Sequence, residues 1–207
     1  PPESVLNCYR VNMVPLLAAC PEAGLPPSEI RPVAGGTGPA PAFEAPHGWW
    51  IKRGDVHNTC DRDVARIGRW QDLEAVLEDF SKREITHFIA QPHVPGDLVK
   101  FYGVGPGRWF TWFYHDPARA LGVPFDPGVL GAAAAAAAKA VDLQVFGGDA
   151  IIEPRAKGRP GPGDIRVIDI NSWPSFARVR REAAVQVAAH LLELVRRRGG
   201  ERRRSRL

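Results

Sequence analysis

The amino-acid sequence predicts an α+β fold built on mixed and antiparallel sheets. Its segments follow one another as helix, strands, helix, strands, helix, hairpin and helix, which is typical of α+β proteins rather than of doubly wound parallel sheets. The 207 residues, 44% of them hydrophobic, can bury one sizeable core or two smaller ones that share a cleft. The sequence contains neither the glycine-rich dinucleotide fingerprint nor a P-loop, so a nucleotide site would have to be built in another way.

The N-terminal third predicts one helix and two strands. Apolar residues recur at helical spacing over residues 5–17, and Pro15 is expected to kink or end this helix. The Pro- and Gly-rich segment from Pro21 to Pro46 predicts loops around one short strand. Aromatic and β-branched residues over 48–53 then predict a strand, which a polar loop over residues 54–63 follows.

The middle of the chain predicts a helix and three strands. Residues 73–80 place their apolar side chains on one face of an amphipathic helix. Strands are expected at His87–Val94, Leu98–Val104 and Arg108–His115, with turn residues between them. We expect these strands to form one antiparallel meander, and we interpret the alternating aromatic residues of the third as core and sheet surface.

The C-terminal part predicts two helices on either side of a hairpin. Asp126-Pro127 is a helix-start signal, and the alanine-rich residues 131–141 that follow predict a tightly packed helix. Strands are expected at Leu143–Ile152 and Ile165–Ile170, joined by a Pro/Gly turn. A long helix from about Arg178 to Arg198 is expected to close the fold.

The net charge of +4 is concentrated at the C-terminus. Residues 196–207 contain seven Arg and one Glu, a net charge of +6, so the body of the chain is mildly acidic. We interpret this tail as a solvated end and expect no nucleic-acid partner. No apolar run approaches the roughly 18–20 residues of a membrane span, so we expect a cytoplasmic protein without membrane contact. The three cysteines lack the spacing of a disulfide framework or a zinc site.

The two C-terminal strands carry the strongest functional signal. Asp169 and Asn171 are two residues apart and would project from the same face of one strand, and a hairpin would bring Asp149 beside them. Two carboxylates and an amide oxygen are ligands suited to Mg²⁺. An isolated Asp-Ile-Asn run would more readily be a turn cap, but the Gly-Gly-Asp run on the preceding strand favours a metal site.

This pattern resembles the ATP-grasp superfamily, in which an acidic residue on one strand and an acidic-x-Asn pair on the next bind magnesium. The run IDINSWP, residues 168–174, is similar to that of inositol trisphosphate kinases, and the chain also resembles ligases of the glutathione synthetase and RimK type. The resemblance implies an ATP-grasp fold, two α+β subdomains with mixed or antiparallel sheets that enclose a nucleotide cleft. It implies ATP and Mg²⁺ as cofactors, with Mn²⁺ as an alternative.

The resemblance implies roles for residues around the first strand of the small subdomain. Lys52 would hold phosphate oxygens, since an ammonium is a suitable point charge for them. The loop that begins at Gly54 would cover the phosphates with backbone N–H groups. His57 would contact phosphate or substrate, although an exposed loop histidine is an equally good interpretation.

The segment IAQPHVPGDLVKFYGV, residues 89–104, resembles the hinge of the family. The resemblance implies that Gln91, His93 and Val94 line the adenine pocket. It also implies that Asp97 contacts the ribose and that Lys100 has a catalytic role on the phosphates or the substrate.

Arginines follow the metal strand at the start of the last helix. Arg178, Arg180 and Arg181, with Ser175 and Phe176 before them, could meet an anionic or carboxylate substrate. We assign Arg180 as a catalytic candidate beside Lys100. Solvent-facing arginines at a helix start are an equally good interpretation.

The resemblance divides the chain into four parts. Residues 1–46 would form the N-terminal helix and a connecting segment, and residues 47–95 the small subdomain with the phosphate-covering loop. Residues 96–195 would form the large subdomain with the metal site, and residues 196–207 a basic, disordered tail. Too few residues precede Trp49 for the additional N-terminal α/β domain of family members, so we expect that domain to be reduced or absent from this chain.

The function that the resemblance implies is that of an ADP-forming ligase. It would join a carboxylate to an amine or a thiol through an acylphosphate, with an unidentified small molecule or peptide as substrate. An ATP-dependent small-molecule kinase is the first alternative. A non-catalytic nucleotide-binding or nucleic-acid-binding protein is the second.

Overall fold

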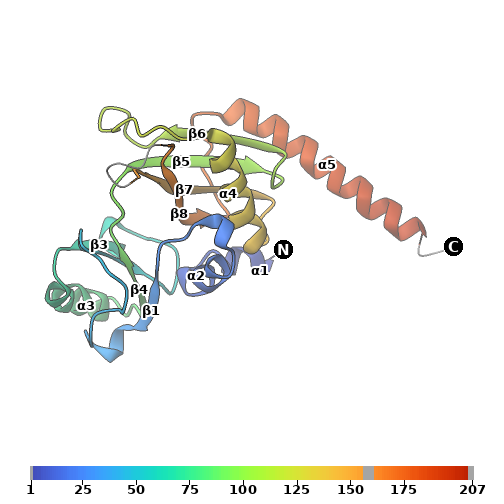
Figure 1. Ribbon diagram of the computed structural model, residues 1–207. Helices are drawn as coiled ribbons and strands as arrows, with labels where there is room; N and C mark the ends of the chain where they lie inside the picture. Colours follow the sequence, from blue (N-terminus) through green and yellow to red (C-terminus); the bar gives the residue numbers. More distant parts are fainter. Residues whose placement is uncertain (1, 156–160, 205–207) are drawn as a thin grey trace.

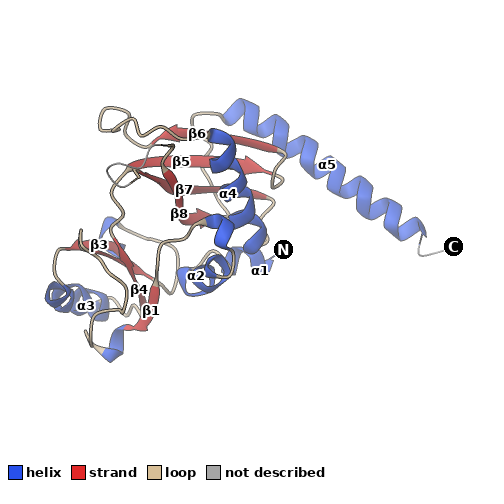
Figure 2. Cartoon of the chain, in the orientation of Figure 1, coloured by secondary structure: helices blue, strands red, loops and turns tan. Residues whose placement is uncertain are grey.

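The computed structural model describes residues 2–155 and 161–204. The chain forms two four-stranded antiparallel sheets, and helices pack against both of them (Figures 1 and 2). This architecture agrees with the predicted α+β class. None of the helices in the described part of the chain has both the length and the apolar composition that a bilayer crossing needs.

The small sheet has the strand order β1-β4-β2-β3. Its strands are β1 (Glu29–Pro32), β2 (Trp49–Arg53), β3 (Val64–Ile67) and β4 (His87–Pro92). Helix α3 (Leu73–Lys82) covers the outer face, where Phe80 of the helix packs with Ile51 and Phe88 of the sheet in a separate core. The opposite face, with Lys52, looks toward the large sheet.

The large sheet has the strand order β6-β5-β7-β8. Its strands are β5 (Asp97–Val104), β6 (Trp109–Tyr114), β7 (Val145–Glu153) and β8 (Asp164–Asn171). Helix α4 (Pro127–Ala140) lies against one face, and the Asp126 side chain caps it by accepting a hydrogen bond from the Gly128 N–H. Ala134, Ala137 and Ala138 of this helix are fully buried, because alanine side chains allow the helix to approach the sheet closely. The predicted packed helix is confirmed.

The N-terminal helical region contradicts one detail of the prediction. It consists of α1 (Pro2–Leu6) and α2 (Arg10–Ala18), and the break lies between them rather than at Pro15. Pro15 stands inside α2, where proline removes only its own N–H bond to the preceding turn. The helix continues past it because Met13, Val14 and Leu17 are buried in the core of the large sheet.

The predicted meander of three strands is also wrong. His87–Pro92 forms β4 of the small sheet, whereas the next two strands pair as β5 and β6 of the large one. Residues 93–96 cross from one sheet to the other, because Pro92, Pro95 and a Gly96 with φ of 151° prevent a tight hairpin. Strand β3, which the sequence analysis assigned to no element, pairs with β2 after the loop.

The last helix extends beyond its predicted end. Helix α5 runs over Arg180–Arg204, past its predicted end at about Arg198, and projects away from the rest of the molecule (Figure 1). The prediction of a disordered tail from residue 196 is therefore wrong for residues 196–204, which continue the helix. Short 3-10 helices complete the regular structure; they lie at Pro21–Ala23, Val33–Gly35, Asp61–Asp63 and Trp70–Asp72. Part of the predicted Pro/Gly turn, residues 156–160, and the last residues of the basic tail, 205–207, lie outside the described residues.

Candidate functional site

Strands β7 and β8 bring the predicted metal ligands together. Asp149 and Asp169 are direct partners in the antiparallel register, and Asn171 stands opposite Gly147 two residues further along. The side chains of Asp149 and Asp169 are 29% and 25% exposed, so both are mostly withdrawn from water. Among the described residues, no group of three or more His, Cys, Asp or Glu side chains is arranged to hold a metal ion. The third member of the predicted set is an amide, that of Asn171.

Glycines on β7 give the neighbouring groups room. A Cβ at Gly147 would lie 2.6 Å from the Pro174 side chain, and one at Gly148 would lie 2.3 Å from the Asp169 carbonyl oxygen. Contacts this short are not tolerated, so only glycine fits at either position. The Gly-Gly-Asp run therefore lets β8 and the loop after it lie close against β7.

Lys100 neutralises one of the carboxylates. Its Nζ donates a hydrogen bond of 2.7 Å to Asp149 Oδ1, and the two residues are register partners on β5 and β7. Burial raises the pKa of Asp149, with the charge of Asp169 adding to this effect, while Lys100 acts in the opposite direction. A carboxylate in this position favours a cation beside it.

Arg10 of helix α2 neutralises the other carboxylate. Its Nη2 donates to Asp169 Oδ2 at 2.8 Å, and its Nη1 donates to the Arg53 carbonyl oxygen and to Asn58 Oδ1. Burial alone would raise the pKa of Asp169, but Arg10 and Lys52 hold it below its usual value. Sequence analysis missed Arg10. The only sequence feature that could have pointed to Arg10 is that it is a single arginine within a helix that contributes to the core.

One donor of Arg10 has no acceptor. The residue is 7% exposed, and among the described residues its buried Nε has no hydrogen-bond partner. Buried polar groups in folded proteins are nearly always paired, so an unpaired donor at a charged site is suited to an oxygen of a bound anion. Arg10 therefore both holds Asp169 and offers a free donor.

Lys52 is buried between the two sheets. Its Nζ donates to Gln91 Oε1 at 2.8 Å and to the Ile168 carbonyl oxygen at 3.4 Å, one residue before Asp169. Gln91 in turn donates to Ser28 Oγ, so its amide fixes Lys52 rather than facing a base. Burial, together with the charge of Arg10, lowers the pKa of Lys52 to about 8.

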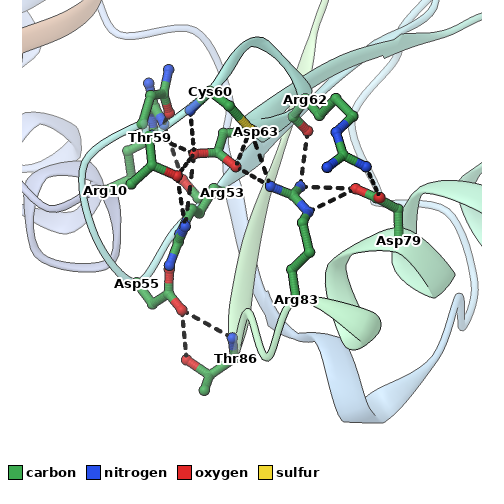
Figure 3. A network of polar contacts seen from close by, with 11 residues as sticks. Arg10, Arg53, Asp55, Thr59, Cys60, Arg62, Asp63, Asp79, Arg83 and Thr86 are labelled. Atoms are coloured by element: carbon green, nitrogen blue, oxygen red, sulfur yellow. Dashed lines mark hydrogen bonds and ion pairs between the residues drawn. The ribbon is translucent and has the colours of Figure 1, made fainter.

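The predicted covering loop, residues 54–63, is fixed at its C-terminal end. The fully buried Asp63 carboxylate accepts hydrogen bonds from the Thr59 N–H and from Arg83 Nη1 (Figure 3). Burial alone would raise the pKa of Asp63, but these hydrogen bonds hold it well below its usual range. This end of the loop is thus tied to the segment after α3.

The other end of the loop is fixed as well. Asp55 pairs with Arg53 at 2.7 Å and accepts from the Thr86 N–H at 3.0 Å. Gly54 closes the strand, because its N–H donates to the His87 carbonyl oxygen. The sequence predicted that this N–H would cover a phosphate. It is not free to do so, because it is already bonded. Only the loop tip, residues 56–58, remains outside these anchors.

The loop tip lies against α2. His57 packs edge-on against Tyr9, with ring centroids 5.2 Å apart, and Asn58 accepts from Arg10 Nη1 at 2.7 Å. The charge of His57 also acts on Asp169. Residues distant in sequence, from α2, the loop tip and β8, thus surround one carboxylate.

The hinge residues line a cavity between the sheets. This cavity has a volume of about 640 Å³, within the range of small-molecule sites, and His93 and Val94 line it together with Glu153 and Arg166 of the large sheet. The His93 N–H donates to the Gly48 carbonyl oxygen, and its Nδ1 accepts from Trp50 Nε1. Two of the three residues predicted to line an adenine pocket, His93 and Val94, therefore line this cavity, and the His93 N–H is already used.

Asp97 has a structural role in place of the predicted ribose contact. It is 2% exposed, and its two carboxylate oxygens accept hydrogen bonds from the backbone N–H groups of Leu121 and Val123. Buried carboxylates satisfied by two backbone donors hold loops in place. Asp97 secures the segment between β6 and α4, and both of its carboxylate oxygens are bound to backbone N–H groups.

Arg180 is not brought to the carboxylates. It is the first residue of α5 and lines a largely apolar groove with Trp173 and Leu191, where Trp173 is 92% exposed. Ser175, Phe176 and Arg178 lie closer to the cleft face of the large sheet, against Tyr102 and Phe113. The arginine that the structure associates with this face is therefore Arg178.

The donor set around the paired carboxylates fits a divalent cation bound with phosphates. Asp149 and Asp169 place carboxylate oxygens on adjacent strands, and Asn171, on the strand of Asp169, adds an amide; oxygens of this kind are hard donors. Lys52, Lys100 and Arg10 bring three positive groups to the same place, and one donor of Arg10 is free. Such a mixture suits phosphate oxygens and Mg²⁺ together.

Comparison with models of protein families and with curated protein sequences finds no match. Solved structures of similar fold include the D-alanine-D-alanine ligase from Coxiella burnetii, with a TM-score of 0.66 and 14% identity over 98% of this chain. They also include the D-alanine-D-alanine ligase from Bacillus anthracis, with a TM-score of 0.61 and 11% identity over 94% of this chain. A third is the ATP-grasp ligase PsnB complexed with a minimal precursor, with a TM-score of 0.53 and 19% identity over 84% of this chain.

The chain spans only part of these proteins: 61% of the Coxiella ligase, 68% of the Bacillus ligase and 55% of PsnB. Identities below one fifth carry no information about substrate, but the agreement in fold extends over nearly the whole of this chain. The two antiparallel sheets, joined by the crossing at residues 93–96, agree with that result. The chain has the ATP-grasp fold.

Proposed function

We propose that this chain is the nucleotide-binding and metal-binding part of an ATP-grasp ligase that depends on Mg²⁺. The reaction would transfer the terminal phosphoryl group of ATP to a carboxylate, and an amine or a thiol would then displace phosphate from the acylphosphate. The products would be ADP, phosphate and an amide or thioester.

One observation carries this proposal. Asp149 and Asp169 face each other across β7 and β8, and the cationic groups of Lys52, Lys100 and Arg10 surround them from three different elements. Withdrawing two neighbouring carboxylates from water is unfavourable unless cations accompany them. A site with this balance of charge is suited to phosphates and a divalent cation.

The path of the nucleotide follows the strands of the large sheet. The hinge cavity lies beside Glu153 and Arg166, whereas the carboxylates lie three to four residues further along β7 and β8. Three residues of strand span roughly 10 Å, a separation that a nucleoside triphosphate can bridge. Adenine would occupy the cavity beside His93 and Val94, and the phosphates would reach the carboxylates.

The chain's own groups would act by positioning and by charge neutralisation. Lys52 and Lys100 would hold phosphate oxygens, and the free Nε–H of Arg10 would donate to another. His57 and Asn58 at the loop tip would cover the phosphates. Asp149, Asp169 and Asn171 would hold Mg²⁺, which would neutralise phosphate charge during transfer. No nucleophilic side chain is needed.

Calorimetry with ATP and Mg²⁺ tests the proposal. We expect ATP to bind the wild type only when Mg²⁺ is present, and Asp169→Asn to lose this dependence with at least about a tenfold loss of affinity. Asparagine is preferable to alanine here, because it still offers an oxygen to Arg10 and avoids leaving a buried guanidinium without a partner.

The matched control for this experiment is Asp164→Asn. Asp164 lies on the same strand but is exposed, so its change should leave ATP affinity unaltered. Thermal unfolding of both variants verifies that they fold. Equal ATP affinity of wild type and Asp169→Asn in the presence of Mg²⁺ would contradict the proposal.

The nature of the product separates a ligase from a kinase. Mass spectrometry of reactions with ATP would detect an amide or thioester, with release of phosphate, for a ligase. A stable phosphorylated acceptor with no free phosphate would instead support the small-molecule kinase. The nucleotide site proposed here is the same in both cases.

A further inference from the structure

The cleft face of the large sheet continues beyond the carboxylates as an aromatic surface. Tyr102 follows Lys100 by two residues on β5, and Phe113 of β6 stands opposite Lys100, so both rings lie on the face of the phosphate site. The ring centroids of Tyr102 and Phe113 are 5.5 Å apart, and the Phe176 ring lies 4.9 Å from that of Tyr102. We call these three residues the aromatic surface.

Position along the strands separates this surface from the nucleotide path. The hinge cavity lies at one end of the large sheet, the carboxylates lie next, and Tyr102 stands beyond them, opposite Gly147. An acceptor has to reach the terminal phosphate from the side that the nucleotide does not fill. The aromatic surface occupies that side.

The loop after β8 is held over the aromatic surface in an unusual conformation. Phe176 has a φ of 50°, in the left-handed region that bulky residues rarely adopt. Strain of this kind persists where surrounding contacts enforce it and is frequent at ligand sites. Here the Tyr102 hydroxyl and Ser175 Oγ form a hydrogen bond of 3.3 Å that helps to fix the loop.

Arg178 places a positive charge on the aromatic surface. Its guanidinium carbon lies 4.3 Å from the centroid of the Phe113 ring, and the side chain is exposed. Within the described residues, no acidic side chain forms an ion pair with it. A guanidinium stacked on a ring keeps its edge N–H groups free, and these match the two oxygens of a carboxylate.

We propose that the aromatic surface and Arg178 bind the acceptor, and that the acceptor is a carboxylate attached to an aromatic or other apolar group. The carboxylate lies between Arg178 and Lys100, next to the terminal phosphate. The apolar group packs on Tyr102, Phe113 and Phe176. This assignment rests on the proposed function, because it names the acceptor of the same phosphate site.

NMR titrations of the full chain with Mg²⁺ and a non-hydrolysable ATP analogue test this assignment. Three probes are compared: hydrocinnamate, its amide, which lacks the charge, and propionate, which lacks the ring. We expect hydrocinnamate to bind about tenfold or more tightly than either of the others, because each of them loses one class of contact.

Variants assign the contacts to residues. Arg178→Gln should bring the affinity for hydrocinnamate down to that for the amide, whereas Arg181→Gln, an exposed arginine at the start of α5, should leave it unchanged. Phe113→Leu should reduce the advantage of hydrocinnamate over propionate. Both arginine variants should bind the ATP analogue as the wild type does.

The outcomes separate this inference from the function on which it rests. Equal binding of the three probes, or wild-type affinity for hydrocinnamate in Arg178→Gln, overturns the acceptor assignment. If the ATP analogue still binds in that case, the proposed nucleotide site stands. Failure of the wild type to bind the analogue with Mg²⁺ overturns the proposed function, and the acceptor assignment with it.

Discussion

Lys52 illustrates how burial gives a single side chain its properties. The ammonium is held between two sheets by the Gln91 side chain and the Ile168 carbonyl oxygen, and no carboxylate of the described residues forms an ion pair with it. Burial therefore lowers its pKa to about 8. A phosphate group would supply the counter-charge that Lys52 lacks in the free protein.

The first prediction concerns the pH dependence of this residue. Because bound phosphates favour the charged ammonium, ATP binding should take up a proton at about pH 9, where Lys52 is mostly neutral in the free protein. Calorimetry in buffers of different ionisation enthalpy measures this uptake. Lys52→Met should abolish it, whereas Lys139→Met, an exposed lysine on α4, should not. If Lys52→Met took up as many protons as the wild type, Lys52 would not be the group that is protonated on ATP binding.

The sign of the linked stability effect follows from the same shift. The folded-state pKa of about 8 lies below the value of 10.5 that Lys52 has when unperturbed, so the unfolded state binds more protons between these pH values. The cost of burying the charged form is fully present below about pH 8. It is relieved as the pH rises toward 10.5.

At the scale of elements, one buried histidine of α5 contributes to the contact between this helix and the large sheet. His190 is buried and shares a hydrogen bond of 2.9 Å with the Gln144 side chain. It also lies against Gly105, where a Cβ would be 2.8 Å from the imidazole ring. Burial, with the nearby charge of Arg108, lowers the pKa of His190.

The second prediction is that acid loosens α5. A histidine with a lowered pKa contributes stability above its unperturbed pKa of 6.5, and this contribution is lost as the pH falls below that value. Hydrogen exchange of residues 183–194, corrected for intrinsic rates, should therefore accelerate between pH 7 and about pH 5. His190→Phe should remove most of this pH dependence. Constant corrected rates in the wild type would show that His190 does not secure the helix.

Glycines set the architecture of the strands at the site. Gly147 and Gly148 allow Pro174, Tyr102 and the Asp169 backbone to approach β7, and the sequence run that contains them pointed to the metal strand.

Local sequence was sufficient for α3, α4, α5 and most strands, because their periodicity, capping and turn residues act over short distances. It was insufficient for β3, whose four residues become a strand only by pairing with β2.

At the scale of the whole molecule, α2 joins the two halves. Met13 of this helix packs in the same core as Ile89 of the small sheet and Phe146 of the large sheet. Arg10 of the same helix contacts Asp169 and, through Asn58, the loop of the small sheet. The two sheets are therefore coupled by both apolar and polar contacts.

The third prediction is that this coupling makes unfolding cooperative. Differential scanning calorimetry should show a single transition for the wild type. Ile89→Ala should lower stability by about 2–5 kcal/mol and separate the transition into two, because it removes an apolar contact between the halves. Ile85→Ala, in the core of the small sheet alone, should lower the transition temperature but keep one transition. Two resolved transitions in the wild type would contradict this view.

The sequence by itself determined the α+β class, most elements and the three metal-ligand candidates, because strand periodicity and residue chemistry are local properties. Only the tertiary structure decided that β4 and β5 belong to different sheets, that Arg10 reaches Asp169 from 159 positions away, and that Asp97 is occupied by backbone donors. These features depend on contacts between residues far apart in the chain. No local pattern encodes which distant groups will satisfy a buried charge.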